Sequence, residues 1–292
     1  MTSCGRALSE IPPDLIPRDR IPPDLIVVPA RFGSSRLPGK PLIDIAGRTL
    51  LSRVVAIARE GAARAGNVDV VVATDDQRIC DHAQSLGCAV VMTDPDISSG
   101  SGRAWAVARD RAVAPPIVVN LQGDAPFVQP ALIEALIAAL RESSCSVATP
   151  VVQLPWAALD TLRQHKTVSP FSGTTCTRRE DGRALWFSKT VIPAIRDEQR
   201  LRESAPLSPV FRHIGLYAYR FDVLRRFEAT PPTLYERLEG LEQLRFLETG
   251  EAILTVAADA MPHTMSGIDT PADLAMAERL IAQHGEPQSS WI

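Results

Sequence analysis

Residues 26–44 read Ile-Val-Val-Pro-Ala-Arg-Phe-Gly-Ser-Ser-Arg-Leu-Pro-Gly-Lys-Pro-Leu-Ile-Asp, and this stretch decides the fold. Its apolar start predicts a buried strand, which runs directly into a Gly/Ser loop. The loop carries Arg31, Arg36 and Lys40 before the sequence turns apolar again. A flexible cationic loop at the end of a strand favours a polyanionic ligand, most simply a triphosphate.

The spacing of this loop separates it from two common phosphate-binding motifs. Five residues lie between Gly33 and Gly39, where a Walker A loop has four, and Pro41 replaces the Ser/Thr that would hold magnesium. The dinucleotide G-x-G-x-x-G pattern is missing as well. The alternative is a surface loop with solvated charges. Three cations and two prolines packed so closely after a buried strand favour the binding loop.

Bulk properties are those of an ordinary soluble protein. The chain has 292 residues, 45% hydrophobic content and a net charge of -3, which argues against a dedicated nucleic-acid binder. No apolar run is long enough to span a membrane, and the N-terminus lacks a secretory pattern. The five cysteines form no C-x-x-C pair, so a zinc site is not expected. We therefore predict a cytoplasmic protein with reduced thiols and no membrane or nucleic-acid partner.

The N-terminus carries a duplication, Ile-Pro-Pro-Asp-Leu-Ile, at residues 11–16 and 21–26. Paired prolines oppose regular structure, so residues 1–23 are predicted to form a disordered extension. A single folded domain is expected over residues 24–286.

The pattern after residue 24 alternates short apolar strands with helical periodicity. This alternation predicts a mainly parallel mixed sheet with helices on both faces, a Rossmann-like α/β fold. Ligands of such sheets gather at the carboxyl ends of the strands, where the 31–40 loop, Thr74-Asp75-Asp76 and Gln122-Gly123-Asp124 should meet. The expected strands cover 25–30, 68–73, 89–92 and 117–121, and the expected helices cover 50–65, 78–86, 104–111 and 131–140.

The second half has a different pattern. We predict a nucleotide-binding half over residues 24–146 and a smaller acceptor and dimerisation subdomain over 147–286. Strands are expected at 147–153, 173–179, 184–188 and 214–220, and one amphipathic helix at 234–249.

Two aspartates are candidate ligands for a divalent metal. Asp124 follows a predicted buried strand and a glycine, and Asp269 precedes Thr270-Pro271. Carboxylates at strand ends suit Mg²⁺, but Asp124 could equally form a turn, and Asp269 or Thr270 could cap the helix that begins at Pro271.

The motif Arg31-x-x-x-x-Arg36-Leu-Pro-Gly-Lys40-Pro41 resembles the signature loop of the 3-deoxy-manno-octulosonate (Kdo) cytidylyltransferase, or CMP-Kdo synthetase, family. The resemblance extends from Ile26 to Leu280. It implies a nucleotide-diphospho-sugar transferase-like fold, CTP as substrate, Mg²⁺ on Asp124 and Asp269, and a homodimer. It further implies catalytic roles for Arg31, Arg36, Lys40 and Asp124, and nucleotide binding by Pro29, Ala30, Arg31, Ser35, Arg36, Lys40, Thr74, Asp75, Ser99, Gly100, Arg103, Gln122 and Gly123.

Two further segments resemble the family where the acceptor would bind. Arg-His-Ile-Gly-Leu-Tyr at 212–217 is similar to its Arg-His-Leu-Gly-Ile-Tyr, and residues 239–245 match its Glu-x-x-Glu-Gln-Leu-Arg helix. A solvated helix face and a structural histidine are the alternatives. The resemblance implies a small acidic acceptor bound by Arg212, His213, Tyr217, Glu239, Glu242 and Gln243.

The chain departs from the family at a few polar positions. The family's His-x-Ser-Gly-Thr-Glu-Arg appears with Ile97 and Gly102 in place of the histidine and the glutamate. Ala125 replaces a glutamate, and Ser169 a lysine. Because a site that loses such partners rejects its ligand, two acceptors remain open: a Kdo-type sugar acid, or a carboxylated phosphonate such as phosphonoformate or phosphonopyruvate. A non-catalytic nucleotide-binding protein is the third alternative.

Overall fold

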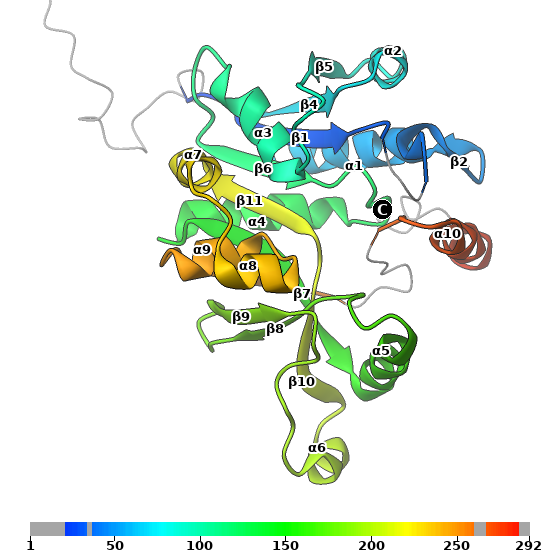
Figure 1. Cartoon of the computed structure of the whole chain (residues 1–292), viewed down its shortest axis with the longest axis vertical. Coiled ribbons are helices and arrows are strands. Elements are labelled where there is room, and N and C mark those ends of the chain that lie inside the picture. The colour runs from blue at the N-terminus through cyan, green and yellow to red at the C-terminus, as the bar shows by residue number, and fades with distance from the viewer. Residues whose placement is uncertain (1–20, 34–36, 260–266, 286–292) are drawn as a thin grey trace, which may run out of the picture.

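A ten-stranded mixed sheet runs through the protein, with helices packed on both faces (Figure 1). The computed structural model describes residues 21–33, 37–259 and 267–285. Most of the predicted N-terminal extension, together with Ser35 and Arg36, lies outside these residues. Within them, no helix is long and apolar enough to cross a membrane.

The N-terminal half confirms the predicted alternation of strands and helices. The third main helix begins at Gly100, four residues before its predicted start, because the Ser99 side chain accepts the Gly102 N–H and caps it. The elements are β1 (Asp24–Ala30), η4 (Lys40–Leu42), β2 (Asp44–Ile45), β3 (Arg48–Thr49), α1 (Leu50–Ala65), β4 (Val68–Thr74), α2 (Gln77–Ser85), β5 (Ala89–Met92), α3 (Gly100–Arg109), β6 (Ile117–Leu121) and α4 (Pro130–Glu142).

The elements of the second half are β7 (Val147–Pro155), α5 (Trp156–Val168), β8 (Thr175–Arg178), β9 (Ala184–Ser188), α6 (Glu198–Ser204), β10 (Leu207–His213), β11 (Leu216–Arg220), α7 (Phe221–Ala229), α8 (Leu234–Glu239), α9 (Gln243–Glu248), β12 (Ile253–Ala258) and α10 (Pro271–His284). Among them, the sequence patterns did not predict α5, α6, β10, α7 and β12. The predicted boundary near residue 146 falls just before β7 and stays a prediction.

The prediction of one helix over residues 234–249 is wrong. Gly240 adopts the left-handed conformation, with φ of 64°, and ends α8 before α9 begins at Gln243. Leu241 and Leu244 are buried, whereas Leu238 is 69% exposed. The leucines therefore do not share one helical face.

The strand order of the main path is β5-β4-β1-β6-β11-β7-β10-β8-β9, and β12 pairs with β7. Neighbours are parallel from β5 to β6 and between β12 and β7, and antiparallel elsewhere. The start of β7 pairs with β11 and its end with β10, so this strand joins the two halves of the molecule. The predicted mixed α/β fold is confirmed.

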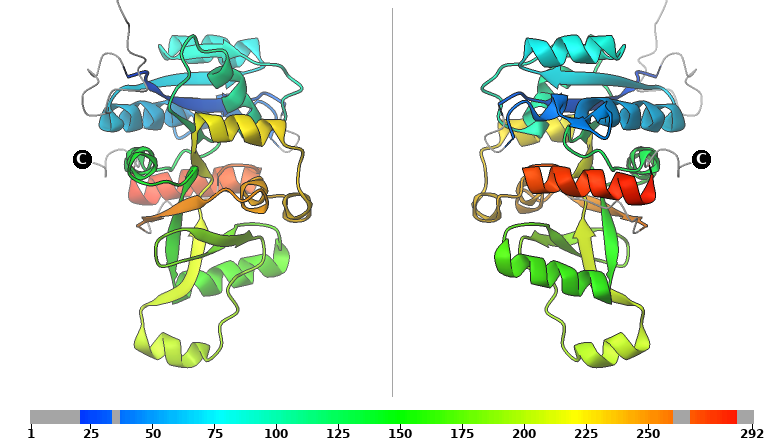
Figure 2. Two further views of the ribbon diagram at one scale, coloured as in Figure 1. Left: turned by 90° about the vertical axis from the view of Figure 1, so that its left-hand side faces the viewer. Right: turned by 90° about the vertical axis from the view of Figure 1, so that its right-hand side faces the viewer.

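Two hydrophobic layers enclose the sheet. Helices α1, α4 and α10 cover one face, and α3, α7 and α9 cover the other (Figure 2). Strand β1 lies between these layers with six of its seven residues, all except Pro29, buried. A smaller cluster under α5 includes Trp156, Leu159 and Val210. The central strands are therefore fixed on both sides, and their carboxyl ends form a rigid edge.

Candidate active site

The three loops predicted to meet at one edge of the sheet do so. Ala30 lies opposite Thr74, and Val27 lies opposite Asn120, so the loops after β1, β4 and β6 leave the sheet together. A cavity opens at this edge. Its lining consists of Pro29, Ala30, Arg31, Lys40, Pro41, Ser98, Ser99, Gly100, Arg103, Gln122, Gly123, Asp124 and Asp269.

Most of the predicted nucleotide-binding residues thus line a single cavity. Thr74 and Asp75 are not among the described residues that do so; Thr74 is fully buried at the end of β4. Ser35 and Arg36 lie outside the described part of the chain. Sequence reasoning missed Pro41 and Ser98, although both adjoin predicted residues.

Gly123 lets the loop after β6 approach β1. A Cβ built at this position would lie 2.2 Å from the carbonyl oxygen of Pro29, a backbone atom that cannot move aside. Only glycine fits such a close approach. Because Gly123 has no side chain, the loop can pass close to Pro29, and this close approach places the next residue, Asp124, at the cavity.

Lys40 joins the two predicted metal ligands. Its Nζ donates to Asp124 Oδ2 at 2.7 Å and to Asp269 Oδ1 at 3.1 Å. The backbone supports this arrangement, because the Ile268 N–H donates to the Asp124 carbonyl oxygen at 2.9 Å. Two carboxylates from segments far apart in the chain thus converge on one cation-sized position.

The alternative cap role falls to Thr270. Its side chain accepts the Asp273 N–H, and Asp273 reaches back to the Thr270 N–H, which is a capping box at the start of α10. Asp269 is therefore not the cap, and its carboxylate points to Lys40 instead. This resolves the choice that the sequence left open between Thr270 and Asp269.

The donor set at this position suits magnesium. Mg²⁺ is usually held by one or two carboxylates and completes its shell with water and substrate phosphates. Asp124 and Asp269 supply those two carboxylates. Among residues 21–33, 37–259 and 267–285, no group of three or more His, Cys, Asp or Glu side chains could hold a metal by itself.

The first turn of α3 forms a second wall of the cavity. The built Cβ position of Gly100 lies 3.1 Å from the Gln122 amide, so the two segments are in close contact. Arg103, in the same turn, is almost fully buried and donates to Asp75 Oδ2 at 2.7 Å and to Thr93 at 2.5 Å. The two predicted nucleotide-binding residues Asp75 and Arg103 are therefore partners of each other.

The predicted acceptor-binding residues also gather in one region. His213 is half-buried, its Nε2 lies 2.8 Å from Thr149 Oγ1, and its ring contacts the rings of Tyr217 and Phe187. Burial lowers the pKa of His213 to about 3, so the ring is neutral at pH 7. Gln243 is also buried, and within the described residues its Nε2 has no hydrogen-bond partner.

Two glutamates connect this region to the surrounding elements. Glu239 accepts hydrogen bonds from Ser188 Oγ and the Lys189 N–H, both at 2.8 Å. Glu242 Oε2 accepts from Ser101 Oγ at 2.7 Å, and burial raises the pKa of Glu242. Because Ser101 follows Gly100 in α3, the acceptor region adjoins the nucleotide cavity.

Two lysines, Lys166 and Lys189, lie close to Glu239. Lys166 Nζ donates to the carbonyl oxygens of Ser172 at 2.5 Å and Gly173 at 2.9 Å, and also contacts that of Lys189. Burial lowers the pKa of Lys166, and the nearby Lys189 and Arg212 lower it further, whereas Glu239 raises it. Sequence reasoning missed Lys166 and Lys189. The only signal for Lys189 was its place just after the expected strand 184–188, and no expected element pointed to Lys166.

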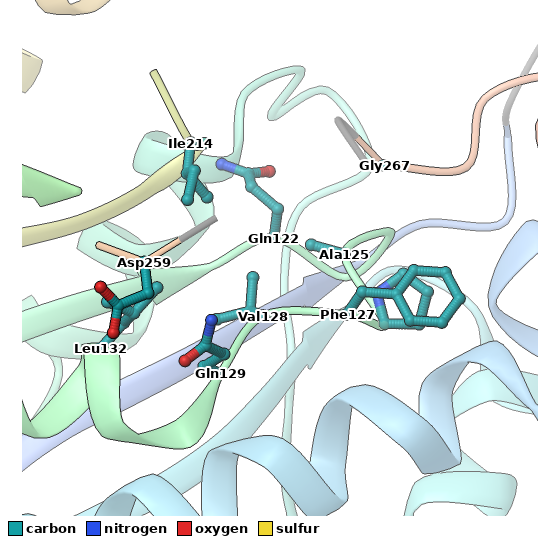
Figure 3. A pocket seen from close by; sticks show the side chains of 11 residues that line it. Gln122, Ala125, Phe127, Val128, Gln129, Leu132, Ile214, Asp259 and Gly267 are labelled. Carbon is teal, nitrogen blue, oxygen red and sulfur yellow. The ribbon is translucent and has the colours of Figure 1, made fainter. Parts of the chain in front are cut away.

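A second, more apolar cavity adjoins the first through Gln122 (Figure 3). Ala125, Val128 and Leu132 come from the loop after β6 and the start of α4, and Ile214 comes from the turn between β10 and β11. Asp259 and Gln129 add polar groups. Ala125, one of the departures from the family motif, therefore borders open space next to Asp124.

A cationic loop and paired carboxylates at the carboxyl edge of an α/β sheet define a nucleotidyltransferase. The comparisons give its family. The profile of the cytidylyltransferase family matches residues 25–253. The 3-deoxy-manno-octulosonate cytidylyltransferase of Maricaulis maris is 43% identical over 90% of this chain and 98% of its own, and that of Vibrio cholerae is 38% identical over 89% and 98%. The chain belongs to the cytidylyltransferase family, in its CMP-Kdo synthetase branch.

Solved structures agree with this assignment. A CMP:2-keto-3-deoxy-manno-octonic acid synthetase complexed with CTP superposes with a TM-score of 0.74 at 35% identity, covering 89% of this chain and 99% of that one. A cytidylyltransferase from Leptospira borgpetersenii has a TM-score of 0.56 at 15% identity, which shows a shared fold. The protein is thus an enzyme of the nucleotidyltransferase class.

Proposed function

We propose that this enzyme couples CTP to a Kdo-type 2-keto sugar acid, giving the CMP-linked sugar acid and pyrophosphate. The observation that carries the proposal is the convergence of Asp124 and Asp269 on Lys40, inside the cavity that Arg31 and the first turn of α3 also line. Cations for a triphosphate and carboxylates for a metal are what nucleotidyl transfer requires.

In the proposed reaction, a hydroxyl oxygen of the acceptor attacks the α-phosphorus of CTP. The new oxygen–phosphorus bond forms as the bond to pyrophosphate breaks, and the hydroxyl proton is released. Arg31 and Lys40, with Arg36 by resemblance, offset the charge of the triphosphate and of the leaving pyrophosphate. Asp124 and Asp269 would hold Mg²⁺, which when bound neutralises charge on the phosphate oxygens.

The acceptor region supports an acidic substrate. Lys189 and Arg212 lie near enough to Lys166 to lower its pKa, and Glu239 is the carboxylate that raises the pKa of both lysines. Within the described residues, no carboxylate lies at ion-pair distance from Lys166 or Lys189. An excess of partly buried positive charge is stabilised by a bound anion. The acid group of the acceptor supplies such an anion.

A carboxylated phosphonate remains the second candidate acceptor. It is favoured by Ala125, which replaces the family's glutamate and borders a mostly apolar cavity. The sugar acid is preferred, because Glu239, Glu242, Gln243 and His213 still provide groups that can hydrogen-bond several hydroxyls.

The proposal includes a cytoplasmic homodimer. Exposed apolar side chains lie on α8, at Leu234, Tyr235 and Leu238, and the Tyr235 ring contacts that of Trp186 on β9. Such a patch suits a second copy of the chain. Mass measurement by light scattering tests the dimer, and a monomer at assay concentration would contradict it.

A pyrophosphate-release assay tests the function. Purified protein is given MgCl₂ and CTP with Kdo, sialic acid, phosphonoformate or phosphonopyruvate in turn. Release with Kdo supports the first candidate, and release only with a phosphonate supports the second. Binding of CTP without release from any acceptor favours the non-catalytic alternative. A preference for ATP or UTP would exclude CTP as the nucleotide.

A further inference from the structure

Glu228, near the end of α7, reaches into the first turn of α3. The two helices pack together, as the 5.3 Å contact between the Trp105 and Phe221 rings shows. Glu228 is half-buried, and its Oε2 lies 3.4 Å from the position that a Cβ of Gly102 would occupy. A carboxylate from another helix therefore lies where a side chain at residue 102 would project.

The Ile97 side chain also lies next to Gly102. A Cβ on Gly102 would also lie 2.9 Å from Ile97 Cγ2 and 2.8 Å from Ser99 Oγ, so Ile97 fills space that a larger residue at 102 would need. The family motif carries a glutamate at 102 and a histidine at 97. In this protein the Ile97 side chain fills the space beside Gly102, and Glu228 supplies a carboxylate there.

The electrostatic surroundings connect Glu228 to the site. Burial raises the pKa of Glu228, the neighbouring Glu242 raises it further, and Arg245 and Ser101 oppose the rise. Ser101 donates to Glu242 Oε2 at 2.7 Å and is also a side-chain hydrogen-bond partner of Glu228, so carboxylates from α7 and from the start of α9 share this hydroxyl. Ser101 is preceded by Ser99 and Gly100, which line the nucleotide cavity.

We propose that Glu228 is a positioning residue of this active site: it restores, from α7, the carboxylate missing at Gly102, and holds Ser101 and the first turn of α3 against the nucleotide and acceptor cavities. This inference rests on the proposed function for its catalytic readout. It means that one polar group missing from the motif has been relocated within the fold. The loss at Gly102 is then no evidence for a different acceptor.

The test is a double-mutant cycle of wild type, Glu228→Val, Gly102→Glu and the double variant. Removing a charged hydrogen-bonding partner should lower kcat/KM for CTP by roughly tenfold in Glu228→Val. Gly102→Glu should also lose activity, because it adds a carboxylate beside Glu228 and crowds Ile97. Each variant is therefore also made on Ile97→Ala, which opens the space beside residue 102. On that background the double variant should recover to within about threefold of Ile97→Ala alone, since coupled sites are not additive.

Two further variants exclude a general effect on folding. Glu228→Gln keeps the shape and removes the charge, and should match Glu228→Val in activity while keeping the wild-type Tm. Asp222→Asn removes an exposed carboxylate from the same helix and should leave both unchanged. Losses that multiply in the double variant, or a Glu228→Val enzyme as active as Asp222→Asn, would overturn the proposal.

Calorimetric CTP binding separates this inference from the proposed function. The same cycle is run on CTP affinity, which needs no acceptor. If wild type binds CTP but releases no pyrophosphate, the proposed function fails. Non-additive changes of CTP affinity in the cycle would still support the positioning role of Glu228. If wild type is active and both cycles are additive, only the role of Glu228 is refuted.

Discussion

Replacing Lys40 by methionine tests how the cavity balances its charge. Lys40 Nζ contacts Asp124 at 2.7 Å and Asp269 at 3.1 Å. Methionine keeps the unbranched chain and removes the ammonium. The two carboxylates then face each other without their cation, which should favour any other cation at the same position.

The expected magnitudes follow from exposure. The Lys40 side chain is 13% exposed, but Asp124 and Asp269 are 30% and 47% exposed, so solvent screens both contacts. Discounted accordingly, the two ion pairs contribute about 1–2 kcal/mol together. For a protein of this size, that corresponds to a Tm lower by about 2–3 °C in metal-free buffer.

In Lys40→Met, the affinities for Mg²⁺ and for CTP should change in opposite directions. Without nucleotide, Mg²⁺ competes with the Lys40 ammonium for the two carboxylates. If Mg²⁺ no longer has to displace an ion pair that contributes about 1.4 kcal/mol, its affinity should be roughly tenfold higher in Lys40→Met. Added MgCl₂ should consequently raise the Tm of the variant more than that of wild type. CTP with Mg²⁺ should bind more weakly, because a cation facing the triphosphate is lost.

The assay is thermal unfolding with titrated MgCl₂, followed by calorimetry with CTP. Lys40→Arg keeps the charge and should stay close to wild type in the MgCl₂ titration, and Arg179→Met, at an exposed site, controls for loss of a surface cation. A Lys40→Met protein that binds Mg²⁺ no more tightly than wild type would refute the competition argument.

Three further predictions concern the cavity and its supports. Asp124→Asn should abolish pyrophosphate release while largely sparing calorimetric CTP binding, and unchanged turnover would remove Asp124 from the mechanism. Gly123→Ala should cost about 3 kcal/mol in urea unfolding, because its Cβ would overlap the Pro29 carbonyl oxygen; a wild-type midpoint would contradict this packing. His213 has a pKa of about 3 when folded and near 6.5 when unfolded, so the unfolded chain takes up more protons and stability falls as pH drops from 6.5 toward 3. Between pH 7 and 5 this loss should be about 2 kcal/mol, and His213→Gln should lack that share of the pH dependence.

Patterns of local origin predicted the first half of the fold well. Strands β1, β4 and β6 show apolar runs, and helices α1 and α4 show apolar residues at helical spacing. Both patterns can be read within a short stretch of the sequence. The same reasoning failed at 234–249, because leucines at helical spacing continue through Gly240, whose left-handed backbone ends the helix. Periodicity counts apolar positions and misses one residue that turns the chain.

The nucleotide side of the site was also predictable in large part. Parallel strands end at a common edge, so Arg31, Gln122 and Gly123 could be placed together from the strand pattern. The sequence could not choose between a metal ligand and a helix cap for Asp269. The capping box of Thr270 and Asp273 gives the cap to Thr270, through hydrogen bonds that depend on backbone geometry, and the metal role of Asp269 stays a prediction.

By itself, the sequence determined a cationic loop after a buried strand and the family to which that loop belongs. Only the tertiary structure decided that Lys40 lies between Asp124 and Asp269, 84 and 229 positions away. It also placed Glu228 beside Gly102 and brought Lys166 to the acceptor region. The physical reason is that a motif records neighbours along the chain, whereas charge and space are balanced between neighbours in three dimensions.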